Sequence, residues 1–583
     1  MGFGRALRNW LISLPEFKVQ RGKKLHGKAL NHAIGFVAGA GFLMFGYDQG
    51  VMSSLLTLPE FESQFPSATP YSPSNELCQQ PGMCTGTPEL QSNMVSIYQI
   101  GCLLGAILIL IVGDSLGRRA STFWGTVIII AGTIIQAAAH DYGTLCFSRI
   151  FTGIGNGMVT STIPTWQSEC AKPKDRGFLI MNEGMLIGFG IMISYWIDFG
   201  FFFCTGSIRW RFPVAFQAFF AIIVASGIFI LPDSPRWLLK KGYIDEAREV
   251  IARLDDVEAD SDLVNEEVAI LEHTLSLESQ KFSWREFWRH GNVQHFRRML
   301  LGVVAQAMQQ YCGINLITYY ATVLFEQSLG FDAMMSRLLA AVNGTEYWLS
   351  AIVAMFMIER FGRRKLMFVG LVGMMCSMAV LAGCISSGTR DSENRIVLEK
   401  APGGVGTLTL FTFNTFFAIG FLGMTWLYPA EINPLRTRVQ ANALSTCSNW
   451  LSNYVIVMIT PPAIANIGYG IYVIFAILNF LFIPIVYFWY PETKGRSLEE
   501  MDVVFAKANA EGVSPVKMAF IMPRLEGSEL ERELARYFDD GSSNGSPTDI
   551  EKTGSKNAED SSSGSSNAAN GASEKVAIPT EKD

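Results

Sequence analysis

Apolar stretches of about 20 residues, separated by short charged segments, recur along the chain up to residue 490. A helix needs about 20 apolar residues to cross the roughly 30 Å hydrocarbon core of a bilayer, so each stretch predicts one membrane span. The spans are 33–55, 92–112, 121–139, 144–163, 180–200 and 211–231, then 299–324, 336–358, 366–386, 405–427, 440–460 and 468–490. The pattern predicts an all-α membrane protein with 12 transmembrane helices in two six-helix bundles, 33–231 and 299–490.

Polar segments flank and separate the two predicted bundles. Residues 1–32 form a basic N-terminus, and 232–298 form a charged linker with helical runs such as Asp245–Leu254. The C-terminal tail, 491–583, becomes rich in Ser, Gly, Asn and acidic residues from about 541. Such a composition has too few apolar residues to build a core, so we expect the tail to be disordered from there.

Lys and Arg are distributed unevenly among the predicted loops. Residues 1–30 carry seven of them, whereas the loop 56–91 carries none. Basic residues in short loops favour the cytoplasmic side of a membrane. This predicts that both termini are cytoplasmic and that 56–91 faces outside. Cys78 and Cys84 both lie in that polar loop, where an oxidising exterior allows a disulfide to form.

Composition excludes several classes of function. Charged residues make up 17% of the chain and hydrophobic residues 49%, whereas an average soluble protein has about 25% charged residues. The net charge of −6 gives no indication of a nucleic-acid partner. No Cys/His grouping has metal-ligand spacing, and no nucleophile lies in a pattern with a base. We therefore expect no metal, no cofactor and no enzymatic activity.

One charge pattern occurs at equivalent places in the two halves. Between the second and third spans the sequence reads Gly113-Asp114-Ser115-Leu116-Gly117-Arg118-Arg119, and between the eighth and ninth it reads Glu359-Arg360-Phe361-Gly362-Arg363-Arg364. In both, an acid precedes a Gly by three residues and two Arg follow it. In a second repeat, Glu169 precedes Arg176 by seven residues and Glu431 precedes Arg438 by seven. The repeats indicate duplicated halves and a pseudo-symmetric pair of bundles.

Acids and arginines at these helix ends predict a cytoplasmic gate. A guanidinium binds a carboxylate through two parallel hydrogen bonds, so such pairs can form when the halves close on the cytoplasmic side and separate when they open. The alternative is that the basic residues only anchor the helix ends, but anchoring requires no acids. The predicted gate residues are Asp114, Arg118, Arg119, Glu169, Arg176, Glu359, Arg363, Arg364, Glu431 and Arg438.

These motifs also resemble those of a known family. The Gly113–Arg119 segment resembles the signature loop of the major facilitator superfamily. Other motifs resemble its sugar porters: Gly46-Tyr47-Asp48-Gln49-Gly50, Arg149, Pro164–Glu169, Pro232–Trp237, Gln309–Asn315 and Pro491–Arg496. The resemblance covers roughly residues 30–505. Stretches such as Tyr195–Gly200 and Thr446–Trp450 are similar to the branch that holds the fungal glycerol:proton symporter and many filamentous-fungal hexose transporters.

Asp48 is an acid inside an apolar span, where an ionisable group is expensive to bury and marks a functional candidate. Arg149 lies near the start of the fourth span. If the two meet, Arg149 holds the ionised Asp48, and protonation releases it. The resemblance implies that the matching pair has this role in proton-linked sugar porters. A static ion pair is the alternative, although a buried pair is weak evidence for stability.

The seventh span carries Gln309, Gln310 and Asn315 in an otherwise apolar helix. Amide groups both donate and accept hydrogen bonds, as hydroxyl groups do. Gln310, Asn315 and Tyr319 follow one another at spacings of five and four residues, so a substrate cavity on one face can use several of them, and Tyr319 and Tyr320 are candidates to close the site from outside. The resemblance implies that Gln309, Gln310 and Asn315 are sugar ligands. The alternative is that these amides form hydrogen bonds between helices.

Trp426 in the tenth span resembles the Trp that stacks on the sugar ring, and Asn449 and Trp450 in the eleventh match further lining positions. Glu183 stands where many sugar porters have a Gln ligand, so it is a candidate substrate contact and a candidate second proton site. Glu346 is an unexpected acid in the eighth span and a further candidate for proton coupling. For Glu346 the alternative is pairing with a neighbouring helix.

Together these features predict a monomeric transporter in the plasma membrane that takes up a monosaccharide, a hexose, with a proton by alternating access. Its expected partners are a small polyhydroxylated substrate, the proton and the lipid bilayer. Three alternatives stay open: a glycerol-type polyol symporter, a sugar facilitator without proton coupling, and a sugar sensor that does not transport.

Overall fold

The computed structural model describes residues 25–71, 78, 82–171, 176–278, 288, 293–390, 396–434, 437–525 and 528–538. Residues 1–530 form one compact unit and 531–583 a second. The second unit contributes only the end of helix α23 (Ser528–Phe538) to the described residues. The segment from 541 that we expect to be disordered lies outside the described residues.

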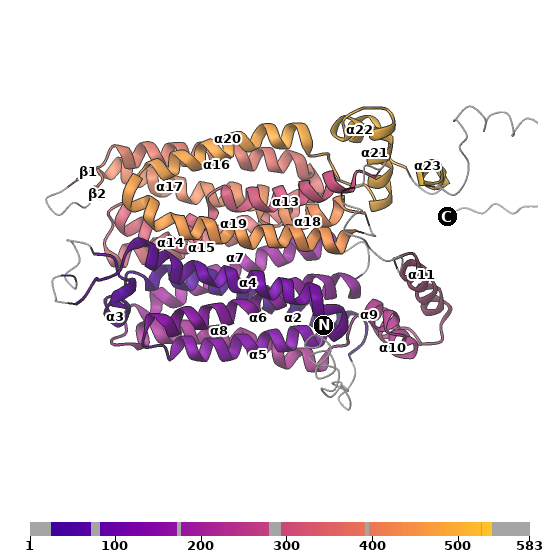
Figure 1. Cartoon of the computed structure of the whole chain (residues 1–583), viewed down its shortest axis with the longest axis horizontal. Helices are drawn as coiled ribbons and strands as arrows, with labels where there is room; N and C mark the ends of the chain where they lie inside the picture. Colours follow the sequence, from indigo (N-terminus) through magenta and orange to yellow (C-terminus); the bar gives the residue numbers. More distant parts are fainter. Residues whose placement is uncertain are drawn as a thin grey trace, which may run out of the picture. The chain divides into compact units, whose positions relative to one another are not determined.

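The first half of the chain forms six long helices (Figure 1). They are α2 (Gly27–Leu55), α4 (Pro88–Leu116), α5 (Arg118–Ala137), α6 (Tyr142–Cys170), α7 (Arg176–Phe201) and α8 (Ile208–Ile230). Local sequence sets where some of them begin. Asp141 caps α6 by accepting a hydrogen bond from the Thr144 N–H at 2.7 Å, and Pro88 occupies the first position of α4, where no N–H is needed.

The second half repeats this arrangement with two broken spans. Its elements are α13 (His295–Tyr311), α14 (Ile314–Val323), η3 (Leu324–Ser328), α15 (Ala333–Phe361), α16 (Arg363–Ser386), α17 (Lys400–Phe417), η4 (Ala418–Leu422), α18 (Met424–Ile432), α19 (Arg438–Ile467) and α20 (Gly470–Trp489). Gly313 separates α13 from α14 and has a φ of +104°, which favours glycine. The turns η3 and η4 are π-helical, a feature frequent at functional sites.

Ten helical segments of the described chain are long and apolar enough to cross a membrane. The two other predicted spans are helical as well, and each misses that measure for a physical reason. α6 carries Arg149 and Asn156 inside the fold, and the span that includes α13 and α14 is interrupted at Gly313. The prediction of an all-α membrane protein with two bundles is confirmed, apart from a short hairpin of β1 (Thr389–Arg390) and β2 (Ile396–Val397).

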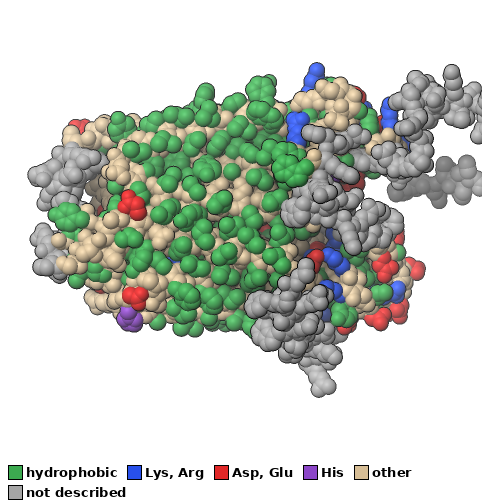
Figure 2. All heavy atoms as spheres, in the orientation of Figure 1, with side chains coloured by type: hydrophobic (Ala, Val, Ile, Leu, Met, Phe, Trp, Pro, Cys, Tyr) green, Lys and Arg blue, Asp and Glu red, His purple; other side chains and the backbone are tan. Residues whose placement is uncertain are grey.

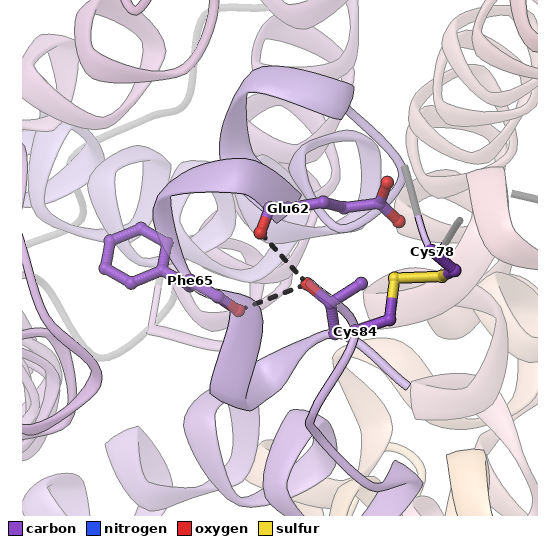
Figure 3. The surroundings of a disulfide bond; sticks show 5 residues. Glu62, Phe65, Cys78 and Cys84 are labelled. Carbon is purple, nitrogen blue, oxygen red and sulfur yellow. Dashed lines mark hydrogen bonds between the residues drawn. A yellow bond between two sulfur atoms is a disulfide. The ribbon is translucent and has the colours of Figure 1, made fainter. Parts of the chain in front are cut away.

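Shorter elements lie at the two ends of the long helices (Figure 1). At one end, called the linker end here, are α9 (Pro235–Lys240), α10 (Ile244–Asp255), α11 (Asp262–Glu278), α21 (Leu498–Ala510) and α22 (Pro515–Ile521). The opposite, disulfide end carries α3 (Pro59–Gln64), η1 (Pro66–Ala68) and the β hairpin. There Cys78 and Cys84 form a disulfide beside Glu62 of α3 (Figure 3).

Side chains on the surface follow the same division. Figure 2 shows hydrophobic side chains over the middle of the visible face, with charged ones gathered toward the ends. Inside, glycines let helices touch. A Cβ on Gly153 or Gly157 of α6 would lie within 2.3 Å of a carbonyl oxygen of α4. The glycine-rich segment of α6 therefore allows close packing of this helix on α4. The two bundles meet where α2 packs on α14, α4 on α19, and α7 on α15.

Candidate functional site

A cavity of about 40 Å³ lies between the two bundles and receives side chains from both. Its lining is formed by Phe45, Gln49, Ile187, Gln309, Gln310, Ile314, Asn315, Thr318, Tyr347, Phe417, Leu422, Trp426 and Asn449. Five of these side chains are amides, four are aromatic and none is charged. The structure therefore brings together the predicted amides of the seventh span with Trp426 and Asn449.

The amides are already ordered by hydrogen bonds to one another. Asn449 Nδ2 donates to Gln309 Oε1 at 2.8 Å and to Gln306 Oε1 at 2.5 Å. Gln310 Nε2 donates to the same Gln309 oxygen at 3.3 Å, and Asn315 donates to Gln310 Oε1. Networks of this kind hold donors and acceptors in place before a ligand arrives. Sequence reasoning missed Gln306, although it lies three residues before Gln309 on the same helix.

The broken span of η4 and α18 supplies the other partners of this network. Gln309 Nε2 donates to the carbonyl oxygens of Phe421 and Leu422 at 3.1 and 3.3 Å, and Gln306 Nε2 donates to the Thr425 oxygen at 2.9 Å. A π-helical turn interrupts the ordinary ladder of backbone hydrogen bonds and leaves carbonyls available. Substrate contacts on α13 are thus tied directly to the broken span that carries Trp426.

Three predicted substrate contacts lie outside the cavity lining. Trp450 is buried behind it, with its ring 5.3 Å from that of Phe45 in an edge-on arrangement. Tyr319 is also buried, and its hydroxyl has no hydrogen-bond partner among the described residues. The neighbouring Thr318 lines the cavity instead. Glu183 of α7 is 5% exposed and is likewise absent from the lining.

Asp48 and Arg149 meet inside the first bundle, as the sequence predicts. Their closest atoms, Asp48 Oδ1 and Arg149 Nη1, are 3.9 Å apart, and the side chains are 4% and 0% exposed. Arg149 Nη2 donates to the Val95 carbonyl at 3.2 Å, and its guanidinium lies 5.1 Å from the centre of the Tyr98 ring. Both Asp48 oxygens lack a hydrogen-bond partner among the described residues. The pair is loose, so either group can change partner without breaking a short bond.

Glu346 lies on a different face of its helix from the cavity. Its Oε1 accepts hydrogen bonds from Ser350 at 2.6 Å and from Thr415 at 2.5 Å, which ties α15 to α17. The carboxyl group borders a second hollow of about 310 Å³ together with Val342, Thr345, Leu349, Ser350 and Val353. The structure thus supports pairing with a neighbouring helix for Glu346.

The gate residues form equivalent ion pairs in the two halves. Arg118 binds Glu169 through two nitrogens, each 3.0 Å from a carboxylate oxygen, and Arg363 binds Glu431 in the same way at 2.5 and 3.1 Å. Each arginine also pairs with the acid four residues earlier, Asp114 at 3.3 Å and Glu359 at 3.1 Å. These pairs join helices of one bundle. In this structure they are not the clasp between bundles that the sequence suggests.

Other predicted gate residues have backbone partners. Arg119 donates to the Ile228 carbonyl at 3.1 Å, Arg364 to the Tyr487 carbonyl at 2.6 Å, and Arg438 to the Asn433 carbonyl at 3.4 Å. The Arg176 side chain lies outside the described residues.

Two acids that sequence reasoning did not assign complete the gate. Asp233 accepts hydrogen bonds from the backbone N–H groups of Arg118 and Arg119, and Glu492 accepts them from those of Arg363 and Arg364. Burial raises the pKa of the Asp233 carboxyl above its ordinary value of 3.8. A signal for both acids is present in the sequence, because each follows a Pro directly after the last helix of its half.

A family model described as sugar (and other) transporter matches residues 34–505. The chain belongs to the sugar porter family of the major facilitator superfamily. This confirms the family that the motifs resemble, and members of this family are membrane transporters and not enzymes.

Named relatives of the transporter are fungal. The sugar transporter STL1 of Saccharomyces cerevisiae is 38% identical over 555 residues, which cover 94% of each chain. The major facilitator superfamily transporter mfsA of Aspergillus fumigatus is 38% identical over 511 residues, or 87% of this chain and 92% of the relative. The fold matches that of the proton:xylose symporter XylE bound to 6-bromo-6-deoxy-D-glucose, with a TM-score of 0.67 and 22% identity over 82% of this chain and all of the other.

Proposed function

We propose that this transporter carries a monosaccharide, a hexose, together with a proton across the plasma membrane into the cytoplasm by alternating access. The observation that supports this most directly is the pairing of two sites. An uncharged amide and aromatic cavity lies between the bundles, and a buried Asp48–Arg149 pair lies in the wall of one of them.

The lining of the cavity fits a neutral polyhydroxylated molecule. Amides both donate and accept hydrogen bonds, as sugar hydroxyls do, and an indole such as that of Trp426 offers an apolar face to ring C–H groups. With no ionised side chain in the lining, a carboxylate, phosphate or ammonium group would lose its hydration without gaining a partner. The name of the yeast relative, a sugar transporter, agrees with this class.

Movement of the bundles is required because the cavity is small. About 40 Å³ accommodates a few water molecules and not a sugar. The substrate therefore enters only when the bundles separate at one end. The ion pairs at the linker end, which lie within single bundles, keep the moving parts rigid during this step.

Proton coupling follows from the loose buried pair. When Asp48 is ionised, Arg149 is its counter-ion, and a carboxylate without that partner would be very costly at this depth. When Asp48 is protonated, Arg149 loses its counter-ion and keeps only its hydrogen bond to the Val95 carbonyl. The relative energy of the outward-open and inward-open conformations then depends on whether Asp48 is protonated. Glu183 and Glu346 are proposed as further proton sites of lower rank, because neither lines the cavity.

The orientation that we propose places the linker end and both termini in the cytoplasm. Basic residues at the linker end support this assignment. The opposite end then faces outside, where an oxidising environment suits the Cys78–Cys84 disulfide. The protein is proposed to act as a monomer, since the cavity is complete within one chain.

A polyol symporter is a second candidate that one observation favours. Tyr347 and Phe417 occupy part of the lining with their rings 6.1 Å apart, which leaves less space for a six-membered sugar ring. Glycerol or a sugar alcohol would satisfy the same amides with less volume.

Uptake in a yeast strain without its own hexose and glycerol transporters tests both candidates. Radiolabelled glucose, fructose, xylose and glycerol are offered at equal concentrations, with and without an uncoupler. We expect glucose or fructose to accumulate above the external concentration and the uncoupler to reduce the internal level to equilibrium. Preference for glycerol selects the polyol candidate. Uptake that an uncoupler leaves unchanged selects a facilitator, and binding without uptake selects a sensor.

A further inference from the structure

Side-chain hydrogen bonds join the two bundles at the disulfide end. The Thr322 N–H of α14 donates to Ser53 Oγ of α2 at 3.2 Å, and the Ser54 and Thr322 hydroxyls are 3.1 Å apart. Tyr195 of α7 donates to the Thr318 carbonyl of α14 at 2.5 Å. This end of the transporter is therefore closed by polar contacts between α2 and α7 on one side and α14 on the other.

Arg337 of α15 crosses the same seam with one arm of its guanidinium. Nη2 donates to three oxygens of the first bundle: the Ser54 carbonyl at 3.4 Å, the Thr57 carbonyl at 3.1 Å and Thr57 Oγ1 at 2.8 Å. Nη1 instead stays with its own bundle, donating to the Ala333 carbonyl at 2.8 Å and lying 3.8 Å from Glu326 Oε2. The Arg337 side chain is 1% exposed.

The acceptors on the first bundle are suited to a cation. α2 ends at Leu55, and the last carbonyls of a helix have no partner within it and carry partial negative charge. Asp198 of α7 adds a buried carboxyl group on the same side of the seam, and this group interacts electrostatically with Arg337. The guanidinium thus contacts three oxygens of the first bundle, and the Asp198 carboxyl of that bundle adds a longer-range attraction.

We propose that Arg337 is a gating residue that holds the bundles together at the disulfide end and is released when that end opens. A rocking motion would break the Nη2 bonds, since their acceptors move with the first bundle, but not the Nη1 contacts, since these move with Arg337. In the open state Glu326 remains the counter-ion of Arg337, so release of the Nη2 bonds does not leave an unpaired guanidinium. The inference rests on the alternating-access part of the proposed function, and its test rests on the proposed orientation of the disulfide end, but neither needs the substrate or the proton.

Arg209 provides a matched control because it shares the surroundings of Arg337 without crossing the seam. Both guanidiniums lie over the Phe202 ring, at 4.7 Å for Arg337 and 4.8 Å for Arg209. Arg209 binds Glu60 at 2.7 Å and the Phe202 carbonyl at 2.7 Å, all within the first bundle. Its removal deletes the same charge and the same stacking, but no contact between bundles.

The test measures how fast a membrane-impermeant maleimide labels a cysteine in the seam on intact cells, without substrate. Ser54→Cys is the reporter, because Ser54 is 2% exposed and its backbone contact to Arg337 survives the change. The parent carries the same reporter, so loss of the Ser54–Thr322 hydroxyl contact is common to all variants compared. Cys204 and Cys384 are free cysteines near the ends of α7 and α16, so both are replaced by Ser in every variant. We expect Arg337→Ala to speed labelling about tenfold, as loss of a charge-assisted bond shifts the equilibrium toward the open state. Arg209→Ala should leave the rate unchanged.

Two milder variants keep the proposal testable if Arg337→Ala fails to reach the membrane. Arg337→Lys keeps the charge, but an ammonium group cannot make the Nη1 and Nη2 contacts at the same time. Thr57→Val removes only one acceptor. For both variants we expect labelling rates about threefold above that of the parent. Labelling at the parental rate in these variants overturns the proposal, as does an equal increase in Arg209→Ala. Because no transport is measured, a failure here is distinct from a failure of sugar uptake or proton coupling.

Discussion

Asp233 and Glu492 hold equivalent positions in the two halves of the transporter. Asp233 accepts the backbone N–H groups of Arg118 and Arg119 at 3.1 and 3.4 Å, and Glu492 accepts those of Arg363 and Arg364 at 2.9 and 3.1 Å. Each acid thus caps the helix whose first residues include the gate arginines. Each also begins the polar segment that leaves its bundle, so the linker and the C-terminal segment are fastened to the gate.

Removal of either cap should loosen the linker end. We expect Asp233→Ala and Glu492→Ala each to lower the stability of the purified transporter by about 1 kcal/mol, the usual contribution of an N-terminal cap. Thermal unfolding in detergent measures this as a fall in Tm. Glu258→Ala is the control, because Glu258 is an exposed acid of the linker. A double variant no less stable than either single variant would show that the caps do not act independently in their own halves.

The Asp233 cap should also give stability a particular pH dependence. Burial raises the pKa of this carboxyl above 3.8, although hydrogen bonds and Arg119 oppose the shift. Between 3.8 and the raised value the folded protein holds a proton that the unfolded chain has lost, so stability falls as the pH rises through that window. Asp233→Asn cannot titrate. As the pH rises from about 4 toward neutrality, we expect the Tm of the parent to fall relative to the Tm of Asp233→Asn.

Asp48→Asn should separate proton coupling from substrate movement. An amide resembles the protonated carboxyl, so Arg149 loses its charged partner permanently. We expect exchange of labelled sugar to continue while accumulation above the external concentration is lost. Asp141→Asn is a suitable control, since Asp141 is an acid outside the membrane spans that only caps α6. Undiminished accumulation by Asp48→Asn would refute the coupling role.

The sequence is sufficient to predict those features of the molecule that depend on helix length and residue type. Apolar runs located all twelve spans, and the amides of α13 were identified because polar side chains are conspicuous in an apolar helix. The direction in which a side chain points is harder to predict. Successive residues are rotated by about 100° around a helix, and a break in the helix changes the direction of every residue after it. Gly313 is such a break, and it lies between Gln310 and Thr318. Thr318 therefore faces the cavity, and Tyr319, which the helical spacing favours, does not.

Contacts between distant segments could not be read from the sequence. Gln306 becomes part of the site because it donates to the Thr425 carbonyl of α18 and accepts from Asn449 of α19, which lie 119 and 143 residues away along the chain. Arg337 lies near the start of α15, and only the folded structure brings the end of α2 against it. Charge repeats located the gate but gave no indication that its pairs lie within bundles.

Gln310→Ala should weaken substrate binding without abolishing transport. Gln310 lines the cavity and links Gln309 to Asn315, so its loss removes one ligand and loosens another. A single hydrogen bond contributes about 1 kcal/mol, which corresponds to a rise in apparent KM of about fivefold. Gln217→Ala is the matched control, because Gln217 is an equally buried amide of α8 that does not line the cavity. An unchanged KM for Gln310→Ala removes that residue from the site.

The disulfide gives a test of orientation that is independent of transport. If the disulfide end faces outside, Cys78 and Cys84 are oxidised and do not react with an impermeant maleimide on intact cells. In a variant with Cys204 and Cys384 replaced by Ser, we expect labelling only after mild reduction. Labelling should then disappear again when Cys78 and Cys84 are also replaced. If instead labelling requires permeabilised cells even after reduction, the disulfide end is cytoplasmic and the proposed direction of transport is reversed.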